Sequence, residues 1–587
     1  MNYKLNTTTE IKQKSTWVAV KTLLPLLVNE KRNLAITFFA VVVNSCINLV
    51  GPFIVGRAVD TYVLKGSYPG VVISSLILLV LFAIGLFSSY FQTKIMGSVS
   101  QRLLYTLRKT VFEKLQELPV AFFNQNKAGD LISRINNDID KLNQFFSQSL
   151  VQFIGSIFIM LGAGAFLLTI NLKLGVATLI PAVLLLGITQ MLSPWVKRKN
   201  AANLKSTGDI SAEIQESLNN FKVIIAFNRR DYFRAKFEQS NQENYKMAVG
   251  AGIANNFFTP IYGFAATLAQ MIVIVLGIYL VLHGEFTIGL LISFISYANN
   301  FYNPLRQLAA LWANFQTALA GWDRITAILN LKNDLHQISE NATTSIPDAG
   351  ILTFKDVSFT YPEGKEVLHD INFTLEPGKT YALVGPTGGG KTTTASLMAR
   401  IFDPTQGKVF LDGKDIRTYS SEERAKKIGF ILQEPFLFTG TVKDNIVYGN
   451  EAYQNLSEEA LQKVIKDQQL DALFTWFEQG LGTKISTGGD TISLGQRQII
   501  AFVRAVLRHP DILILDEATA NIDTVTEQLL EEILKKLPAK TTRVIIAHRL
   551  NTIENADEIF FVNDGEVAPA GSMEHAVEML LHGKRKS

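Results

Sequence analysis

Six uncharged stretches of the sequence constrain the fold of this chain more than any other feature. A helix needs about 20 apolar residues to cross the hydrocarbon of a membrane, where every backbone polar group must be bonded within the helix. Buried helices of a large soluble protein would not account for six such stretches, each bounded by charge. We therefore predict six membrane-spanning helices, at Leu34–Gly56, Val71–Gln92, Leu150–Ile170, Leu174–Trp195, Phe257–Leu282 and Phe286–Pro304.

The links between these stretches predict the orientation of the chain. The links after the second and fourth stretches, Lys94–Lys141 and Lys197–Lys246, are long and basic, and basic loops stay in the cytosol. We expect both loops to be helical, to extend the spans into the cytosol and to turn over at a short transverse helix. Both termini are then cytosolic. Trp17–Val28 is predicted to be an amphipathic helix on the inner membrane surface. Residues 1–16 are polar and lack the apolar core of a secretory signal, which favours a bacterial inner membrane over an organelle membrane.

Composition divides the chain and excludes several classes of function. Charged residues make up only 18% of the sequence, and the shortage is confined to the first half. The net charge of +4 is too small to indicate nucleic-acid binding. The single cysteine, Cys46, excludes an intramolecular disulfide and a thiolate metal site. We predict an N-terminal cytosolic segment with an interfacial helix (1–33), a helical membrane domain (34–328), a linker (329–350) and an α/β nucleotide-binding domain (351–587).

A glycine-rich loop with the spacing G-x-x-x-x-G-K-[ST] follows the apolar run Tyr381–Val384 and precedes a predicted helix, Thr393–Ile401. Its glycines let backbone N–H groups converge on a phosphate, and the helix N-terminus adds positive potential. Lys391 would reach the β- and γ-phosphates of ATP, and Thr392 would bind Mg²⁺. The predicted ATP-binding residues here are Gly385, Pro386, Thr387, Gly388, Gly389, Gly390, Lys391, Thr392 and Thr393.

Two further apolar runs end in polar residues that could serve the same site. Ile512–Leu515 is followed by Asp516, which would hold Mg²⁺ through water, and by Glu517, which would polarise the attacking water. Arg543–Ala547 is followed by His548, which would orient that water, although such a histidine is often only a polar edge residue. Tyr361 would stack on adenine, or would simply pack in the core.

In this order the residues resemble a half-transporter of the ATP-binding-cassette exporter family, over nearly the whole chain from Trp17. The resemblance implies that Gln433 senses Mg²⁺ and the γ-phosphate and that Ala520–Asp523 is the D-loop, with Asp523 at the nucleotide interface. Phe122–Asn126 with Gly129–Arg134, and Glu213–Ser217 with Val223–Phe227, resemble the two exporter loops that carry coupling helices. The fused order, with the membrane domain first, favours export over import.

The chain departs from the family pattern at one place. The family signature L-S-G-G-Q reads Ile492-Ser-Leu-Gly-Gln496, which keeps Ser493, Gly495 and Gln496 as ATP-contacting residues but replaces a glycine by Leu494. Thr487 stands where a glutamate is usual. We expect the leucine to crowd the γ-phosphate of an ATP held by the opposite subunit. The resemblance then implies a heterodimer whose partner has a normal signature and lacks an effective catalytic glutamate. The alternative is a homodimer that tolerates Leu494 in both sites.

The cargo is predicted from the membrane stretches, which contain no acidic residue and many phenylalanines. This favours a hydrophobic or amphipathic compound, moved by alternating access. Polar side chains in the stretches either contact cargo or bond helices together: Asn44, Asn48, Gln270, Tyr297, Asn299, Asn300, Tyr302 and Asn303. A lipid or peptide translocator, and an ATP-gated channel or regulatory subunit, remain alternatives. The six spans argue against a soluble chromosome or DNA-repair ATPase.

Overall fold

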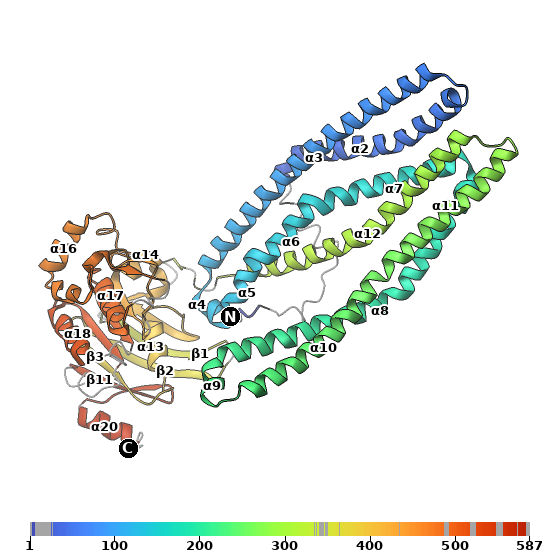
Figure 1. Ribbon diagram of the computed structural model, residues 1–587. Coiled ribbons are helices and arrows are strands. Elements are labelled where there is room, and N and C mark those ends of the chain that lie inside the picture. The colour runs from blue at the N-terminus through green and yellow to red at the C-terminus, as the bar shows by residue number, and fades with distance from the viewer. Residues whose placement is uncertain are drawn as a thin grey trace. The chain divides into compact units, whose positions relative to one another are not determined.

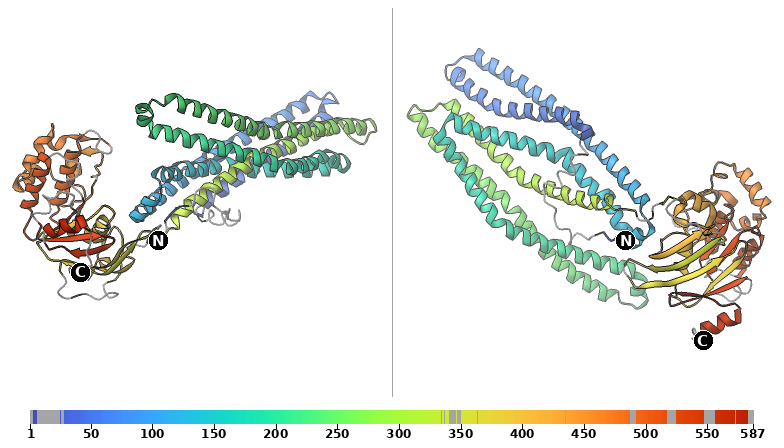
Figure 2. Two further views of the ribbon diagram at one scale, coloured as in Figure 1. Left: turned by 90° about the horizontal axis from the view of Figure 1, so that it is seen from below. Right: turned by 180° about the vertical axis from the view of Figure 1, so that it is seen from behind.

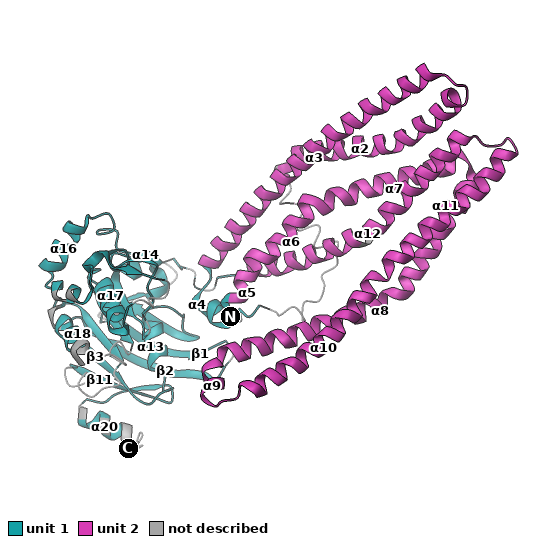
Figure 3. Ribbon diagram, in the orientation of Figure 1, with its two compact units in different colours: residues 1–5, 117–128, 331–587 teal, residues 6–116, 129–330 magenta. Residues whose placement is uncertain are grey.

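Long helices fill the part of the chain before residue 331, and an α/β domain with two large sheets follows (Figure 1). The computed structural model describes residues 3–5, 25, 28–333, 335, 337–339, 346, 350–362, 364–433, 435–486, 492–516, 524–546, 556–571 and 573–582. The predicted interfacial helix Trp17–Val28 lies almost entirely outside these residues. The chain forms two compact units, coloured separately in Figure 3: residues 1–5, 117–128 and 331–587 make unit 1, and residues 6–116 and 129–330 make unit 2.

Four helices of the first part, those of the first, second, fourth and sixth predicted spans, are longer than the apolar stretches that predict them, whereas the helix of the third span matches its stretch and that of the fifth begins one residue later. The second predicted span ends at Gln92, whereas its helix continues to Glu117. The helices are α2 (Lys31–Ala58), α3 (Tyr68–Glu117), α4 (Val120–Gln125), α5 (Ala128–Ser133), α6 (Ile139–Gln144), α7 (Leu150–Ile170), α8 (Leu172–Asn219), α9 (Phe221–Ala226), α10 (Arg230–Asn256), α11 (Phe258–Leu282) and α12 (Ile288–Leu329). A 3₁₀ turn, η1 (Val28–Glu30), precedes α2, and π-helical turns η2 (Val59–Val63), η3 (Arg134–Asp138) and η4 (Phe145–Ser149) connect others.

Five helices among the described residues are long and apolar enough to span a membrane: Lys31–Val63, Tyr68–Glu117, Ala128–Ile170, Leu172–Asn219 and Arg230–Leu282. They contain the first five predicted spans. The sixth predicted span lies almost wholly within α12, which is a helix of 42 residues but is not among these five. The views in Figure 2 show α10 continuing the line of α11, with α8 alongside both.

Short helices connect the long ones in both predicted cytosolic loops, as we expected from the sequence. α4 and α9 have six residues each and follow α3 and α8. Tight links at the other ends are closed by side-chain caps. Asn171 accepts a hydrogen bond from the Leu174 N–H at 3.0 Å at the start of α8, and Thr287 accepts one from the Leu290 N–H at 3.2 Å at the start of α12. Such caps satisfy N–H groups that a helix leaves unpaired.

The nucleotide domain is built on a six-stranded sheet with the order β12-β11-β3-β10-β9-β6, in which only β12 is antiparallel to its neighbour. A four-stranded antiparallel sheet has the order β2-β1-β4-β5, and β7 pairs with β8. The strands are β1 (Leu352–Thr360), β2 (Glu366–Leu375), β3 (Thr380–Val384), β4 (Gln406–Leu411), β5 (Lys414–Asp415), β6 (Ile428–Ile431), β7 (Gly440–Thr441), β8 (Lys484–Ile485), β9 (Ile512–Asp516), β10 (Thr542–Ile546), β11 (Glu558–Asn563) and β12 (Glu566–Pro569).

Strands β3 and β9 are buried at every residue, which is why both appear in the sequence as continuous apolar runs. The helices of this domain are α13 (Lys391–Met398), α14 (Ser421–Lys427), α15 (Val442–Ile446), α16 (Glu458–Asp467), α17 (Leu494–Val506), α18 (Thr524–Lys536) and α20 (Met573–His582). One core lies between the two sheets, around Leu352, Tyr381 and Ile514, and a second lies around α15–α17, with Ile446 and Val503 at its centre.

Candidate functional site

The glycine-rich loop between β3 and α13 has the backbone that a phosphate site requires. Gly385, Gly388 and Gly390 have φ of +149°, +85° and +113°, where side chains other than glycine are strained. A Cβ at Gly385 would lie 2.0 Å from the Val562 carbonyl oxygen, and one at Gly390 would lie 2.6 Å from Leu368 Cδ2. Helix α13 begins directly after the loop, at Lys391, earlier than the predicted Thr393, and ends at Met398 instead of Ile401.

Lys391 is the cation of this loop. Its side chain is 5% exposed, and its ammonium donates hydrogen bonds to the carbonyl oxygens of Gly385 and Pro386 at 2.9 and 3.0 Å. A buried ammonium is costly unless polar groups surround it, and phosphate oxygens are stronger acceptors for it than neutral carbonyls. The loop therefore keeps a positive charge ready at the N-terminus of α13, where the backbone also favours an anion.

Thr392 and Asp516 meet beside the loop although 124 positions separate them. The Thr392 hydroxyl donates a hydrogen bond to Asp516 Oδ1 at 3.2 Å, and Asp516 is only 4% exposed at the end of β9. A hydroxyl and a carboxylate oxygen are ligands that Mg²⁺ takes in combination with phosphate oxygens and water. The two side chains thus fit the predicted metal role. Among the described residues there is no cluster of three acidic, histidine or cysteine side chains that would bind a metal without nucleotide.

The other predicted catalytic residues follow neighbouring parallel strands. Gln433 follows β6, and its carbonyl oxygen accepts a hydrogen bond from Gln498 Nε2 at 3.1 Å. Glu517 and His548 follow β9 and β10, whose last residues Asp516 and Ile546 are paired. Glu517, His548 and Asp523 themselves lie outside the described residues. The carboxyl ends of parallel strands meet at one edge of a sheet, which is where open α/β sheets hold ligands.

Tyr361 is tied to the phosphate-loop helix. Its hydroxyl and that of Thr393 lie 3.1 Å apart, within hydrogen-bond distance. The ring packs edge-to-face on Phe359 and Phe402, with ring centroids 4.8 and 5.5 Å away. The tyrosine therefore packs in an aromatic cluster, which agrees with a purely structural role. The same contacts hold its ring beside α13, where it could also stack on adenine.

The altered signature forms the start of α17. Ser493 caps this helix by accepting from the Gln496 N–H at 3.2 Å, and Gln496 Oε1 accepts in return from the Ser493 N–H at 2.8 Å. Gln496 Nε2 also donates to the Trp476 carbonyl oxygen at 2.6 Å. Gly495 is buried, whereas Leu494 is half-buried and packs against the core around α15–α17. Thr487 lies outside the described residues.

Two polar residues on the buried face of α17 were not predicted. Gln498, 1% exposed, bonds to the backbone of Gln433 as described above. Arg504 donates to the carbonyl oxygens of Asn445 and Phe436 at 2.7 and 3.2 Å, and burial lowers the pKa of its guanidinium. Both tie the signature helix to the segment after β6. Their signal in the sequence was a polar side chain on the apolar face of an amphipathic helix.

The polar side chains of the membrane stretches mostly bond helices together. Tyr297 donates to the Leu49 carbonyl oxygen and Tyr302 to that of Thr178, both at 2.7 Å. Asn300 donates to the Asn48 carbonyl oxygen at 3.1 Å, and Gln270 is hydrogen-bonded to Asn299. These contacts agree with the alternative that the polar side chains bond helices together and do not contact cargo. Asn44, however, faces a cavity between α2 and α3.

Comparison with known proteins decides the family. A family model described as the ABC transporter transmembrane region matches residues 34–305, and one described as ABC transporter matches residues 368–520. The chain is 34% identical over 570 residues to the uncharacterized ABC transporter ATP-binding protein YfiC of Bacillus subtilis, covering 96% of this chain and 93% of that protein. The chain belongs to the ATP-binding-cassette (ABC) transporters.

Two other relatives carry more specific names. The chain is 32% identical over 482 residues to a fatty acid ABC transporter ATP-binding/permease protein of Mycobacterium tuberculosis, covering 82% of this chain and 75% of that one. It is 31% identical over 511 residues to a probable multidrug resistance ABC transporter ATP-binding/permease protein, YheH of B. subtilis, covering 86% and 74%. This ABC exporter half-transporter is thus an integral membrane protein with an ATP-binding domain, an ATPase coupled to transport.

Proposed function

We propose that this ABC exporter chain is the catalytically competent half of a heterodimer of the multidrug type, which moves hydrophobic or amphipathic drug-like compounds out of the cytosol or the inner leaflet. One contrast carries the proposal. The phosphate loop, Lys391 and the Thr392–Asp516 pair have the geometry of a working ATP site, whereas the signature that would cover the partner's ATP contains Leu494. The defect therefore falls on one of the two sites of a head-to-tail pair.

The residues divide the work of hydrolysis as follows. Lys391 and the loop N–H groups bind the phosphates, and Tyr361 stacks on adenine. Thr392 and Asp516, with Gln433, would hold Mg²⁺, which offsets phosphate charge when bound. Glu517 accepts a proton from the attacking water, and His548 orients it. Ser493, Gly495, Gln496 and Asp523 belong to the surface that meets the partner subunit.

Alternating access links this chemistry to transport. Two ATP molecules between the paired nucleotide domains favour the closed pair, because a ligand shifts an equilibrium only toward the state it binds better. Closure opens the membrane cavity outward, and hydrolysis at the Glu517 site resets it.

We place the membrane domain at 34–328, the nucleotide domain at 351–587, and both termini in the cytosol of a bacterial cell.

The cargo class is supported by the cavity between α2 and α3. It has a volume of about 620 Å³. Its walls combine apolar side chains, such as Phe82 and Leu86, with a few amide and hydroxyl groups, at Asn44, Asn48, Ser89 and Thr93. Ligand sites are mostly apolar with a few placed polar groups. The names of the fatty acid and multidrug relatives agree with an amphipathic cargo. A lipid translocator with the same motor is the second candidate, favoured by the fatty acid relative.

The test is transport by the paired protein in vesicles. A fluorescent amphipathic dye and a fluorescent fatty acid are offered separately, with ATP and with a non-hydrolysable analogue. ATP-dependent movement of the dye supports the drug-type cargo, and movement of the fatty acid alone replaces it by the lipid translocator. If neither probe moves while ATP is hydrolysed, the proposed cargo class is wrong. Robust ATP turnover by this chain purified alone would contradict the heterodimer.

A further inference from the structure

The residues Tyr3–Leu5 are hydrogen-bonded to the end of the short helix α4, more than 120 positions away. The Tyr3 N–H donates to Gln125 Oε1 at 2.8 Å, and the Leu5 N–H donates to Asn126 Oδ1 at 2.9 Å. Asn126 Nδ2 donates back to the Tyr3 carbonyl oxygen at 3.0 Å. Tyr3 and Leu5 are 2% and 8% exposed, whereas Lys4 between them is exposed. This alternation is that of an extended segment with one face buried.

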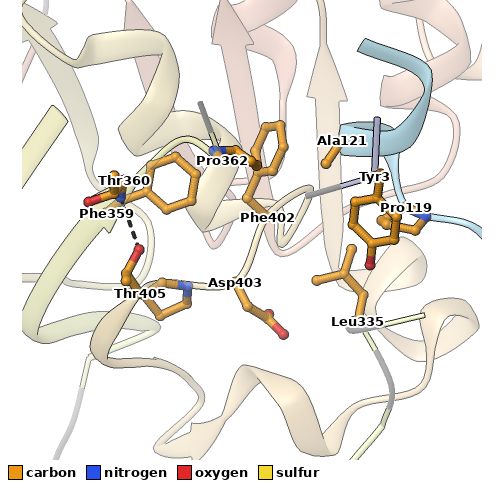
Figure 4. A pocket seen from close by; sticks show the side chains of 11 residues that line it. Tyr3, Pro119, Ala121, Leu335, Phe359, Thr360, Pro362, Phe402, Asp403 and Thr405 are labelled. Carbon is orange, nitrogen blue, oxygen red and sulfur yellow. Dashed lines mark hydrogen bonds between the residues drawn. The ribbon is translucent and has the colours of Figure 1, made fainter. Parts of the chain in front are cut away.

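The ring of Tyr3 lines a cavity that α4 shares with the nucleotide domain within unit 1. The cavity has a volume of about 260 Å³. Figure 4 shows Tyr3 beside Pro119 and Leu335 on one side, with Phe402 in the middle and Phe359 and Thr405 opposite. Five separate parts of the sequence therefore meet here: the Tyr3–Leu5 segment, the turn into α4, Leu335, the end of β1, and the loop after α13.

The same cavity reaches the aromatic cluster of the ATP site. Phe402 contacts Tyr361 and Phe359, with ring centroids 5.5 and 5.6 Å apart. The loop that carries Phe402 is fixed by Arg400, whose side chain is 3% exposed and whose Nε lies 2.9 Å from Asp403 Oδ1. Coupling between sites is carried by chains of packed side chains with more than one arrangement. Tyr361, Phe402 and the Tyr3 cavity form a continuous row of packed side chains between the proposed adenine side and α4.

We propose that Tyr3 is a positioning residue of the transport cycle, which seats α4 against the nucleotide domain. Its backbone is hydrogen-bonded to Gln125 and Asn126 at the end of α4, and its ring lines the cavity beside Phe402. With Tyr3 seated, movement of the aromatic cluster on ATP binding displaces α4 and the membrane helices that follow it. Without Tyr3, hydrolysis continues but moves the membrane helices less. This inference rests on the alternating access proposed above.

The experiment follows a membrane helix without using any cargo. In a Cys46→Ser background, which removes the single cysteine, Asn48→Cys on α2 provides a reporter. The chain is paired with a cysteine-free partner in inside-out vesicles. Labelling by a membrane-impermeant maleimide is measured without nucleotide and with ATP plus vanadate, and ATP turnover is measured on the same vesicles.

We expect Tyr3→Ala to keep kcat and KM for ATP within about twofold while the nucleotide-dependent change in labelling falls about fivefold, within the range that single positions of a coupling network can produce. Tyr3→Phe restores the change because the ring still fills the cavity. Lys4→Ala, on the exposed side of the segment, serves as the control and leaves the change intact.

Two results would overturn the role of Tyr3. One is a Tyr3→Ala protein whose labelling still responds fully to nucleotide. The other is a loss of turnover and of labelling response in equal proportion, since that is what a merely stabilising side chain produces. If the Tyr3-containing protein itself shows no labelling response while hydrolysing ATP, alternating access is refuted and this inference with it.

Discussion

At the scale of single residues, Leu494 decides how the two ATP sites differ. The residue is the first of α17, and part of its side chain packs into the core around α15–α17. The rest of the residue is exposed in the first turn of the helix, and a helix N-terminus is where an anion would bind. The predicted crowding of the γ-phosphate would therefore come from the exposed part of Leu494, and substituting this residue also removes some packing against the core.

We predict that Leu494→Gly raises ATP turnover by this chain alone by about tenfold, because one lost steric contact of about 1.4 kcal/mol in the closed state corresponds to that factor. Leu494→Ala keeps a Cβ and gives a smaller increase. Circular dichroism and melting temperature serve as controls for the fold, because the substitution also removes the packing of Leu494 against the core around α15–α17. Turnover that stays at the level of the original chain would show that Leu494 is not the defect.

At the scale of elements, a buried carboxylate joins α12 to the π-helical turn η3. Asp138 is fully buried, is bonded to the Arg324 guanidinium, and lies 3.0 Å from Lys141 Nζ. Arg134 donates to the Arg324 carbonyl oxygen at 3.1 Å. Removing one partner of a buried ion pair leaves an uncompensated charge and costs about 3–5 kcal/mol, far more than loss of a surface pair.

Asp138→Asn should therefore lower the melting temperature of the purified protein clearly, whereas Asp140→Asn should change it little. Asp140 is the matched control because it pairs with Arg108 at 3.0 Å while both side chains are exposed, and such pairs contribute about 0–1 kcal/mol. The two variants are compared by thermal unfolding in the same detergent. Equal shifts for both would contradict the role assigned to the buried pair.

A second ion pair, between η1 and α3, makes the contact between these elements depend on pH. Hydrogen bonds from Arg102, at 2.6 and 2.9 Å, and from Asn33, at 2.6 Å, lower the pKa of Glu30 from 4.5 to about 2. A lowered pKa in the folded state adds stability above the unfolded value of 4.5, and this stability is lost as pH falls toward 2.

The melting temperature of Glu30→Gln should accordingly lie below that of the original protein by a constant amount from pH 7 to pH 5, and the difference should shrink below pH 4.5. Glu113→Gln is the control, because Glu113 pairs with Lys109 at 3.8 Å and both side chains are exposed. A difference between Glu30→Gln and the original protein that grows on acidification would reverse the sign and refute the argument.

The elements also show how far the sequence could predict the structure. Apolar windows identify the membrane part of a helix, but α3 continues 25 residues past Gln92 as a mixed polar helix that such a window does not detect. The phosphate loop was predictable because its glycines have a fixed spacing, and three of them, Gly385, Gly388 and Gly390, have φ values that other residues rarely adopt. The Gln498–Gln433 bond and the docking of Tyr3–Leu5 were not, since both join short segments that are distant in sequence.

At the scale of the whole molecule, the proposed heterodimer makes a prediction that a homodimer cannot share. The competent site combines this chain's Lys391, Asp516 and Glu517 with the partner's signature, whereas the other site is covered by the signature that contains Leu494. If the partner lacks an effective glutamate, nearly all hydrolysis depends on Glu517. General bases contribute about 10²–10⁴-fold to rate, so Glu517→Gln should lower turnover of the pair by at least about 100-fold.

Substitution of the partner residue that aligns with Glu517 should change turnover by less than about twofold, because the ATP site covered by the signature with Leu494 contributes little to steady-state hydrolysis. Both variant pairs should still bind ATP, which equilibrium binding of a fluorescent nucleotide measures independently of turnover. The Glu517→Gln pair should also remain closed in ATP, since closure depends on binding and opening depends on hydrolysis. Equal losses from the two substitutions would mean that both sites hydrolyse ATP, and the asymmetry inferred from Leu494 would then be wrong.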